Sequence, residues 1–287
     1  MACSLKFRDG LRLSTASFLD LFKSHFFPPL FQKQTLAAEH KVQIQLILLY
    51  APTDDRPLME EILRALPPEM DASSHWQLMP MLTKNNSDLT SSDLGAKLTD
   101  ALLRVRQIQQ SISENTTRND RTGPVVFLGM DSPETPLDEL EAVFLPSHQH
   151  EAVLCPAADG GYGMLSVPST IDASTVFAGI RWSQPLTAVS QLKALSDAAT
   201  AGSTRLTTRL GRLMYDVDEP EDVRSLWTRL QRKQSNKSGA NNTSRTTTDV
   251  LLRSSAAPGR ERNGSCPLTY TFLEAVFQTQ VTSQDIG

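Results

Sequence analysis

Three acidic residues follow apolar segments of the chain, and their positions could support metal-dependent chemistry. The carboxylates are Asp131, Asp159 and Asp218, and the apolar segments before them are residues 125–130, 152–155 and 212–215. If these segments are strands of one open α/β sheet, the acids meet at one edge, because ligands bind beyond the carboxyl ends of such strands. Hard divalent cations prefer oxygen ligands and often share them with substrate phosphates. The pattern therefore predicts a site that binds a nucleoside diphosphate or triphosphate through a divalent metal.

Each acidic motif also has a purely structural interpretation. Residues 131–133, Asp-Ser-Pro, have the composition of a turn or helix cap. Residues 159–161, Asp-Gly-Gly, are typical of a hairpin turn. Asp218 could cap a helix that begins at Pro220, where nearby acids would favour the positive end of the helix. Sequence alone leaves both interpretations open for each motif.

The elements that must position these acids can be predicted from hydrophobic patterning. Strands are predicted at residues 42–50, 125–130, 152–155, 162–167 and 212–215. Helices are predicted at residues 57–66, 93–110, 136–144, 184–199 and 220–230. Strands that alternate with helices indicate an α/β fold, a three-layer sandwich with a mostly parallel sheet between helices.

Four regions differ in composition. They are an N-terminal segment at 1–41 with one helix near 15–26, a domain at 42–231, a linker at 232–265 and a C-terminal tail at 266–287. The linker is rich in Ser, Asn, Thr, Arg and Gly and has no hydrophobic period, which predicts disorder.

Charge and composition exclude several classes of protein. The chain has 28 basic and 32 acidic residues, a net charge of −4, so no basic excess favours nucleic acid. No apolar run reaches the roughly 18 residues of a membrane span. Three widely spaced cysteines argue against a disulfide framework and favour a reducing compartment. We expect a cytoplasmic protein, although basic residues at 6, 8 and 12 leave organellar targeting open.

Several motifs in a fixed order resemble one family. They are Gly-Met-Asp-Ser-Pro at 129–133, Pro-Ala-Ala-Asp-Gly-Gly-Tyr at 156–162, Phe-Ala-Gly-Ile-Arg-Trp-Ser at 177–183 and Tyr-Asp-Val-Asp-Glu-Pro-Glu-Asp at 215–222. Residues 49–52 and 93–98 match further pieces of the pattern. Over residues 46–230 the chain resembles the glycosyltransferase-A-like group labelled radical-SAM/selenodomain-associated transferases.

The resemblance implies a nucleotide-diphospho-sugar transferase fold and assigns roles to individual residues. It implies that Asp131 and Asp218 are ligands of Mg²⁺ or Mn²⁺ and that Asp131 and Asp159 are catalytic. It also implies a set of substrate-binding residues, namely Ser132, Gly160, Gly161, Tyr162, Trp182 and Ser183. For Trp182 and Ser183, the neighbouring apolar residues favour packing over ligand contact.

The sequence departs from this family at its start. The family's first strand leads into a Lys-x-Pro-x-Pro-Gly-x-x-Lys-Thr-Arg-Leu loop that grips phosphates, and this loop does not occur in the chain. We therefore expect the first strand of the fold to be lacking.

Three functions are compatible with the sequence. The first is transfer of a glycosyl group from a nucleotide sugar to an unknown acceptor. The second is nucleotidyl transfer from a nucleoside triphosphate with release of pyrophosphate. The third, favoured by the missing loop, is a truncated or catalytically inactive binding relative. Dinucleotide and P-loop functions are disfavoured, because neither Gly-x-Gly-x-x-Gly nor a Walker loop occurs.

Overall fold

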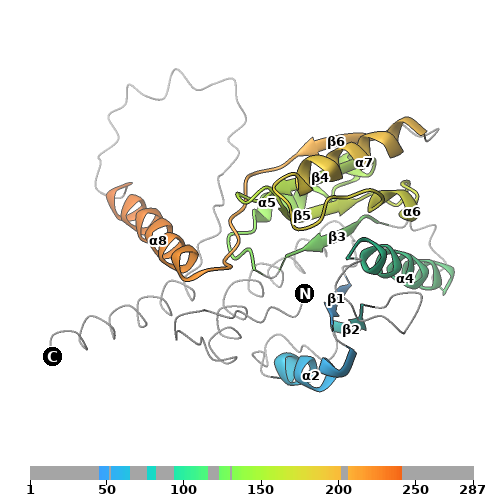
Figure 1. Cartoon of the computed structure of the whole chain (residues 1–287), viewed down its shortest axis with the longest axis horizontal. Helices are drawn as coiled ribbons and strands as arrows, with labels where there is room; N and C mark the ends of the chain where they lie inside the picture. The colour runs from blue at the N-terminus through green and yellow to red at the C-terminus, as the bar shows by residue number, and fades with distance from the viewer. Residues whose placement is uncertain are drawn as a thin grey trace.

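The structure, a computed structural model, describes residues 45–51, 53–64, 76–81, 94–115, 123–129, 131–201 and 206–240. Its elements form a mixed α/β architecture (Figure 1). Two sheets are present in this part of the chain, one of two strands and one of four. The smaller sheet pairs β1 (Leu46–Tyr50) with β2 (Trp76–Pro80) in parallel. Along the chain, α2 (Arg56–Arg64) comes between these two strands.

The four-stranded sheet has the order β3-β5-β4-β6. Its strands are β3 (Val125–Leu128), β4 (Glu151–Pro156), β5 (Tyr162–Val167) and β6 (Thr207–Leu210). The β4 and β6 strands are parallel, whereas β5 is antiparallel to both β3 and β4. Hence β3, β4 and β6 run in one direction, and their carboxyl ends share one edge of the sheet. The predicted α/β class is confirmed, and the predicted mostly parallel sheet agrees with the common direction of β3, β4 and β6, to which only β5 is reversed among these four strands.

Helices cover both faces of this sheet. Alternate residues of β4 point to opposite faces, as a pleated strand requires. Ala152 and Leu154 belong to one apolar core, and Val153 and Cys155 belong to the other. The first core includes residues of α4 (Leu94–Asn115), α6 (Ala173–Val176) and α7 (Thr187–Ala201). The second includes Leu140 of α5 (Leu137–Ala142). The sheet therefore lies between two helical layers.

The α4 helix contacts several parts of the fold. Leu102, fully buried, lies in the first core. Arg104 donates a hydrogen bond of 2.6 Å to the carbonyl of Pro80 in β2. Arg106 donates to the carbonyls of Ile171 at 2.6 Å and Pro168 at 2.9 Å. Within the described residues, no helix is long and apolar enough to cross a membrane.

The last strand was predicted in the wrong place. It lies at Thr207–Leu210 rather than at residues 212–215, and Met214 makes an isolated bridge to Ala157. The backbone N–H of Gly211 still bonds to Leu154 O at 2.8 Å, but the chain then leaves the regular ladder. In the apolar stretch that suggested a strand, Leu213 is exposed while Met214 is buried. The apolar residues there belong to a loop that buries one side chain, that of Met214.

Other boundaries also differ from expectation. Helix α8 (Pro220–Ala240), orange in Figure 1, continues past residue 231, so the first part of the predicted linker is helical. Strand β2 and helix α6 were not predicted. The expected N-terminal helix near 15–26, the missing first strand and the tail at 266–287 concern residues outside the described part of the chain.

Candidate functional site

The loop after β3 and the segment after β6 are joined at the carboxyl edge of the sheet. The backbone N–H of Val217 donates a 2.9 Å hydrogen bond to the carbonyl of Asp131. The N–H of Gly129 donates to Gly163 O at 2.8 Å, which holds the start of the β3 loop on β5. Asp131, which is half-buried, thus lies beside the backbone that connects Asp216 and Asp218.

Asp159 reaches the same edge on the turn between β4 and β5. Ala157 N–H donates to Gly161 O at 2.9 Å and closes the turn. Ala158 N–H donates to Met214 O at 3.1 Å, which joins the turn to the segment after β6. The carboxylate of Asp159 accepts a 2.7 Å hydrogen bond from Gly161 N–H and remains exposed. The Asp-Gly-Gly motif therefore forms a turn between strands and also presents an exposed carboxylate.

Four carboxylates influence one another electrostatically at this edge. Burial, together with the negative charges of Asp159, Asp218 and Asp131, raises the pKa of Asp216 to about 6. Burial likewise raises the pKa of Asp218, together with the charges of Asp131 and Asp159. The structure therefore brings the three predicted acids together and adds Asp216. We call Asp131, Asp159, Asp216 and Asp218 the acidic cluster.

The spacing of Asp216 and Asp218 is a sequence signal that points to Asp216 as well. Asp216 and Asp218 are separated by a single residue, so an extended chain would place both on one side. Val217 between them is buried, which agrees with this alternation.

The capping interpretation of Asp218 is replaced by a different residue. The carboxylate of Asp222 accepts hydrogen bonds from the N–H groups of Asp218 at 3.1 Å and Glu219 at 2.8 Å. A carboxylate in the first turn that reaches back in this way satisfies N–H groups at the helix start. Among the described residues, the side chain of Asp218 has no hydrogen-bond or ion-pair partner. It is exposed and available to a ligand.

Two glycines make room for the residues of the β3 loop. A methyl group on Gly129 would lie 2.7 Å from Asp131 Oδ1, and one on Gly163 would lie 2.7 Å from Ser132 Oγ. Ser132 is 1% exposed, and its Oγ lies 3.5 Å from Asp131 Oδ1. Thr135 Oγ1 donates to Ser132 O at 3.0 Å. The burial of Ser132 fits support of Asp131 better than direct substrate contact.

The segment 181–187 packs against the β4–β5 turn. Gly160 has a φ of +92°, and a methyl group there would lie 2.1 Å from Pro185 O. Gly160 O accepts a 2.9 Å hydrogen bond from Ala188 N–H at the start of α7. Ser183 is exposed and adopts a φ of 57°, an uncommon conformation for a residue other than glycine. Ser183 and the Asp159 turn are thus held on one local unit.

Tyr162 and Trp182 belong to an aromatic group. The ring of Trp182 lies 6.4 Å from Tyr162 and 6.3 Å from Phe177, measured between centroids. The hydroxyl of Tyr162 donates a 3.1 Å hydrogen bond to Gln191 Oε1, and burial raises its pKa. Gln191 in turn donates to Val176 O at 2.6 Å. These contacts favour the packing interpretation of Trp182, which is half-buried.

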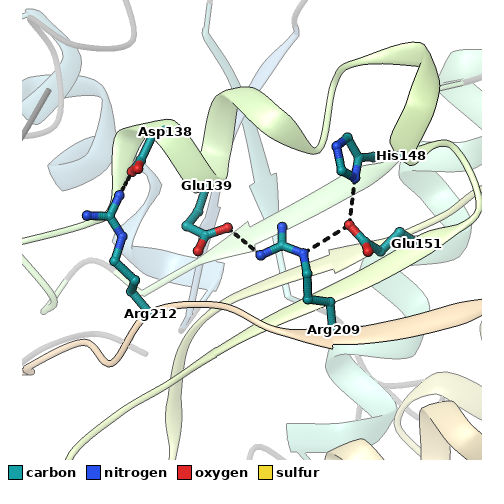
Figure 2. A network of polar contacts seen from close by, with 6 residues as sticks. All are labelled: Asp138, Glu139, His148, Glu151, Arg209 and Arg212. Atoms are coloured by element: carbon teal, nitrogen blue, oxygen red, sulfur yellow. Dashed lines mark hydrogen bonds and ion pairs between the residues drawn. The ribbon is translucent and has the colours of Figure 1, made fainter. Parts of the chain in front are cut away.

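A polar network holds α5 near the segment that leads to Asp216. Figure 2 shows Arg209 of β6 between Glu139 and Glu151, with N–O distances of 2.7 and 3.1 Å. Burial acts to raise the pKa of Glu151, but hydrogen bonds from Arg209 and His148 hold it below its usual value. Arg212 forms an ion pair with Asp138, also drawn in Figure 2. The network therefore ties α5, which follows Asp131, to β6 and Arg212, which precede Asp216.

The acidic cluster can be tested against the needs of a divalent cation. In the part of the chain that the structure describes, no three metal-ligating side chains lie together at ion-binding spacing. Mg²⁺ commonly uses only one or two carboxylates and completes its shell with phosphate oxygens and water. Besides burial, the negative charges of neighbouring carboxylates raise the pKa values of Asp216 and Asp218, and a cation would offset this repulsion. A cation bound at this edge would therefore have at most two side chains of the acidic cluster as ligands.

Comparisons with known proteins agree with this fold. A search of curated proteins found no match. A crystal structure from Desulfovibrio desulfuricans G20, of a protein provisionally named a nucleotide-diphospho-sugar transferase, is similar with a TM-score of 0.50. The two chains are 19% identical, and the match covers 89% of this chain and 81% of the other. This likeness supports the nucleotide-diphospho-sugar transferase fold.

A family profile matches residues 35–184, which include Asp131, Asp159 and the turn at Gly160. Its description is "uncharacterized protein conserved in bacteria". The matched residues make up more than half of the chain. The chain therefore belongs to this bacterial family, DUF2064.

Proposed function

We propose that the protein is a metal-dependent transferase that acts on a nucleotide-linked substrate at the acidic cluster. The observation that carries the proposal is that three separate segments, joined by backbone hydrogen bonds, bring four carboxylates to the carboxyl edge of the sheet, where their charges interact. Clustered like charges cost stability unless a ligand compensates them, so such clusters favour function over structure. The fold shared with the D. desulfuricans protein is consistent with this activity.

The residues of the cluster have different proposed roles. Asp131 and Asp218 hold Mg²⁺ or Mn²⁺, since Asp131 follows the β3 strand and Asp218 has a free carboxylate among the described residues. The bound cation supplies electrostatic stabilisation of the negative charge that develops on the phosphate leaving group. Asp159, exposed on its closed turn, lies on the acceptor side and accepts a hydrogen bond from the attacking group. Gly160 and Gly161 keep that turn compact.

The preferred reaction is transfer of a glycosyl group from a nucleotide sugar, as the provisional name of the D. desulfuricans protein suggests. The acceptor attacks the sugar carbon, the carbon–oxygen bond to the phosphate breaks, and a nucleoside diphosphate leaves. Nucleotidyl transfer would instead release pyrophosphate. The two reactions are separated by identifying the released product.

The proposal is tested by calorimetric titration of the purified protein with UDP, GDP, CTP and GTP in the presence of Mn²⁺ or Mg²⁺. We expect binding of at least one nucleotide that depends on the metal. Asp131→Asn removes one negative ligand and should lower this affinity at least about tenfold while the circular dichroism spectrum is unchanged.

Asp197→Asn is the matched control, because Asp197 is an exposed acid of α7 paired with Lys193 at 2.5 Å. It should bind like the parent protein. A folded parent protein that binds none of these nucleotides with either metal would disprove the proposed function. Equal affinity of the parent protein and Asp131→Asn would move the site elsewhere.

A further inference from the structure

Arg229 of α8 contacts two of the three acid-bearing segments of the site. Its Nε donates a 2.6 Å hydrogen bond to Glu134 Oε2 in the loop after β3. Its guanidinium carbon lies 4.2 Å from the ring centroid of Tyr215, in the segment after β6. Glu134 follows Asp131 by three residues, and Tyr215 directly precedes Asp216. One side chain therefore bridges the two segments that carry most of the acidic cluster.

The environment makes this contact significant for both segments. The side chain of Glu134 is 8% exposed and that of Arg229 is 25% exposed. Removing one partner from a largely buried ion pair leaves an uncompensated charge, which is much costlier than the loss of a surface pair. Arginine is also suited to this position, because its planar guanidinium can hydrogen-bond a carboxylate while it stacks on an aromatic ring.

The acidic cluster itself favours separation of the two segments. Asp131 lies on one of them and Asp216 and Asp218 on the other, and their like charges repel. The hydrogen bond from Val217 N–H to Asp131 O, at 2.9 Å, lies directly across this junction. A contact that holds the segments together against repulsion controls the spacing of the carboxylates.

We propose that Arg229 is a positioning residue for the acidic cluster. It holds the Asp131 loop and the Asp216–Asp218 segment at a fixed spacing through Glu134 and Tyr215. The affinity of the cluster for a divalent cation therefore depends on α8, whose arginine acts through these two neighbours. The consequence for cation binding rests on the proposed function, whereas the positioning itself does not.

The test combines two measurements on the full-length protein. The first is amide hydrogen exchange at Val217, followed by NMR, because its N–H spans the junction. The second is Mn²⁺ titration followed by electron paramagnetic resonance. In Arg229→Gln we expect Val217 exchange to be roughly tenfold faster and Mn²⁺ affinity to be roughly tenfold lower. Arg229→Lys keeps the charge facing Glu134 but lacks the planar stacking group, so it should restore part of both.

Arg106→Gln is the matched control. Arg106 is another partly buried arginine, but its hydrogen bonds go to carbonyls of Ile171 and Pro168 on the α4 side of the sheet. It should lower overall stability without faster exchange specific to Val217. If Arg229→Gln fails to fold, Tyr215→Leu removes the stacking surface and leaves the ion pair, and it should speed Val217 exchange a few-fold.

The outcomes separate the two proposals. Unchanged Val217 exchange in a folded Arg229→Gln, or in Tyr215→Leu if that variant is needed, would overturn the positioning role. Faster exchange spread evenly over the whole protein would also overturn it, since that result reports global stability. If the parent protein binds no Mn²⁺, the proposed metal site fails, and Val217 exchange still decides the role of Arg229.

Discussion

At the scale of single residues, Asp216 shows how a site of like charges affects stability. Burial and three neighbouring acids raise its pKa from 3.8 to about 6. The folded protein therefore binds this proton more tightly than the unfolded chain. It follows that Asp216 lowers stability progressively as pH rises from about 4 through about 6.

Asp216→Asn should consequently stabilise the metal-free protein at pH 7. We expect a gain of about 1 kcal/mol in the free energy of unfolding, because the partial exposure of Asp216 reduces the effect of the full pKa shift. The gain should disappear below about pH 4, where the native carboxyl is protonated in both states. Urea denaturation at both pH values measures this. Asp197→Asn should change the free energy by less than about 0.5 kcal/mol, and an equal gain in that control would argue against charge repulsion.

The positions of three members of the acidic cluster could be predicted from sequence, because each follows an apolar segment. Asp216 directly follows the same apolar segment as Asp218, but its environment could not be predicted from that position. Its importance comes from burial and from three charges that lie on other segments, and neither quantity is encoded locally. The burial of Ser132 was equally hidden, since it depends on the space left by Gly129 and Gly163.

At the scale of elements, two glycines with positive φ differ in the space around them, so their substitution distinguishes backbone strain from steric crowding. Gly160 has a φ of +92° and a methyl group there would lie 2.1 Å from Pro185 O, whereas Gly179 has a φ of +68° and nothing within 4 Å. Gly179→Ala should therefore cost about 1 kcal/mol, the conformational penalty alone. Gly160→Ala should cost about 3 kcal/mol or more, because the backbone of the 181–187 segment must move.

Chemical denaturation of both variants measures this difference. Nucleotide titration then shows whether the turn at Asp159 is displaced, and we expect weaker binding in Gly160→Ala alone. Equal destabilisation by the two substitutions would mean that the turn and the 181–187 segment are not packed together as described.

Element boundaries were predictable where burial follows a clear period. The β5 strand was predicted at its observed residues, 162–167, because it is buried on both faces. The β6 strand was missed, since its residues are Thr-Thr-Arg-Leu with only Arg209 partly covered. An exposed strand carries a weak hydrophobic signal, and its hydrogen bonds to β4 decide its place.

At the scale of the whole molecule, α4 is expected to contribute strongly to stability because it packs on the sheet and reaches β2. Leu102 is fully buried in the first core, whereas its neighbour Leu103 is 42% exposed. Leu102→Ala should lower the free energy of unfolding by about 2–5 kcal/mol. Leu103→Ala should lower it by about 0.5 kcal/mol or less. Denaturation followed by circular dichroism provides the measurement, and similar losses in both variants would contradict the described packing of α4.

The strand order and strand directions could not be predicted from the sequence pattern. Alternation of strands and helices indicated an α/β fold, and this was correct. The direction of β5, the strand order β3-β5-β4-β6 and the separate β1–β2 pair depend on tertiary hydrogen bonds. The hydrophobic pattern of a strand is the same whichever way the strand runs in the sheet, so the local sequence does not determine its direction.

The reversed direction of β5 has a thermodynamic consequence for ligand binding. Because β4 and β5 are antiparallel neighbours, they are joined by one short turn instead of a long crossover, and Asp159 lies on that turn. The backbone of this turn loses its conformational freedom when the chain folds, before any ligand binds. Binding of a ligand to the Asp159 carboxylate therefore costs little additional conformational entropy of the protein, because the group is preorganised. Lengthening this connection would return that cost to the binding step, even if every contact atom were preserved.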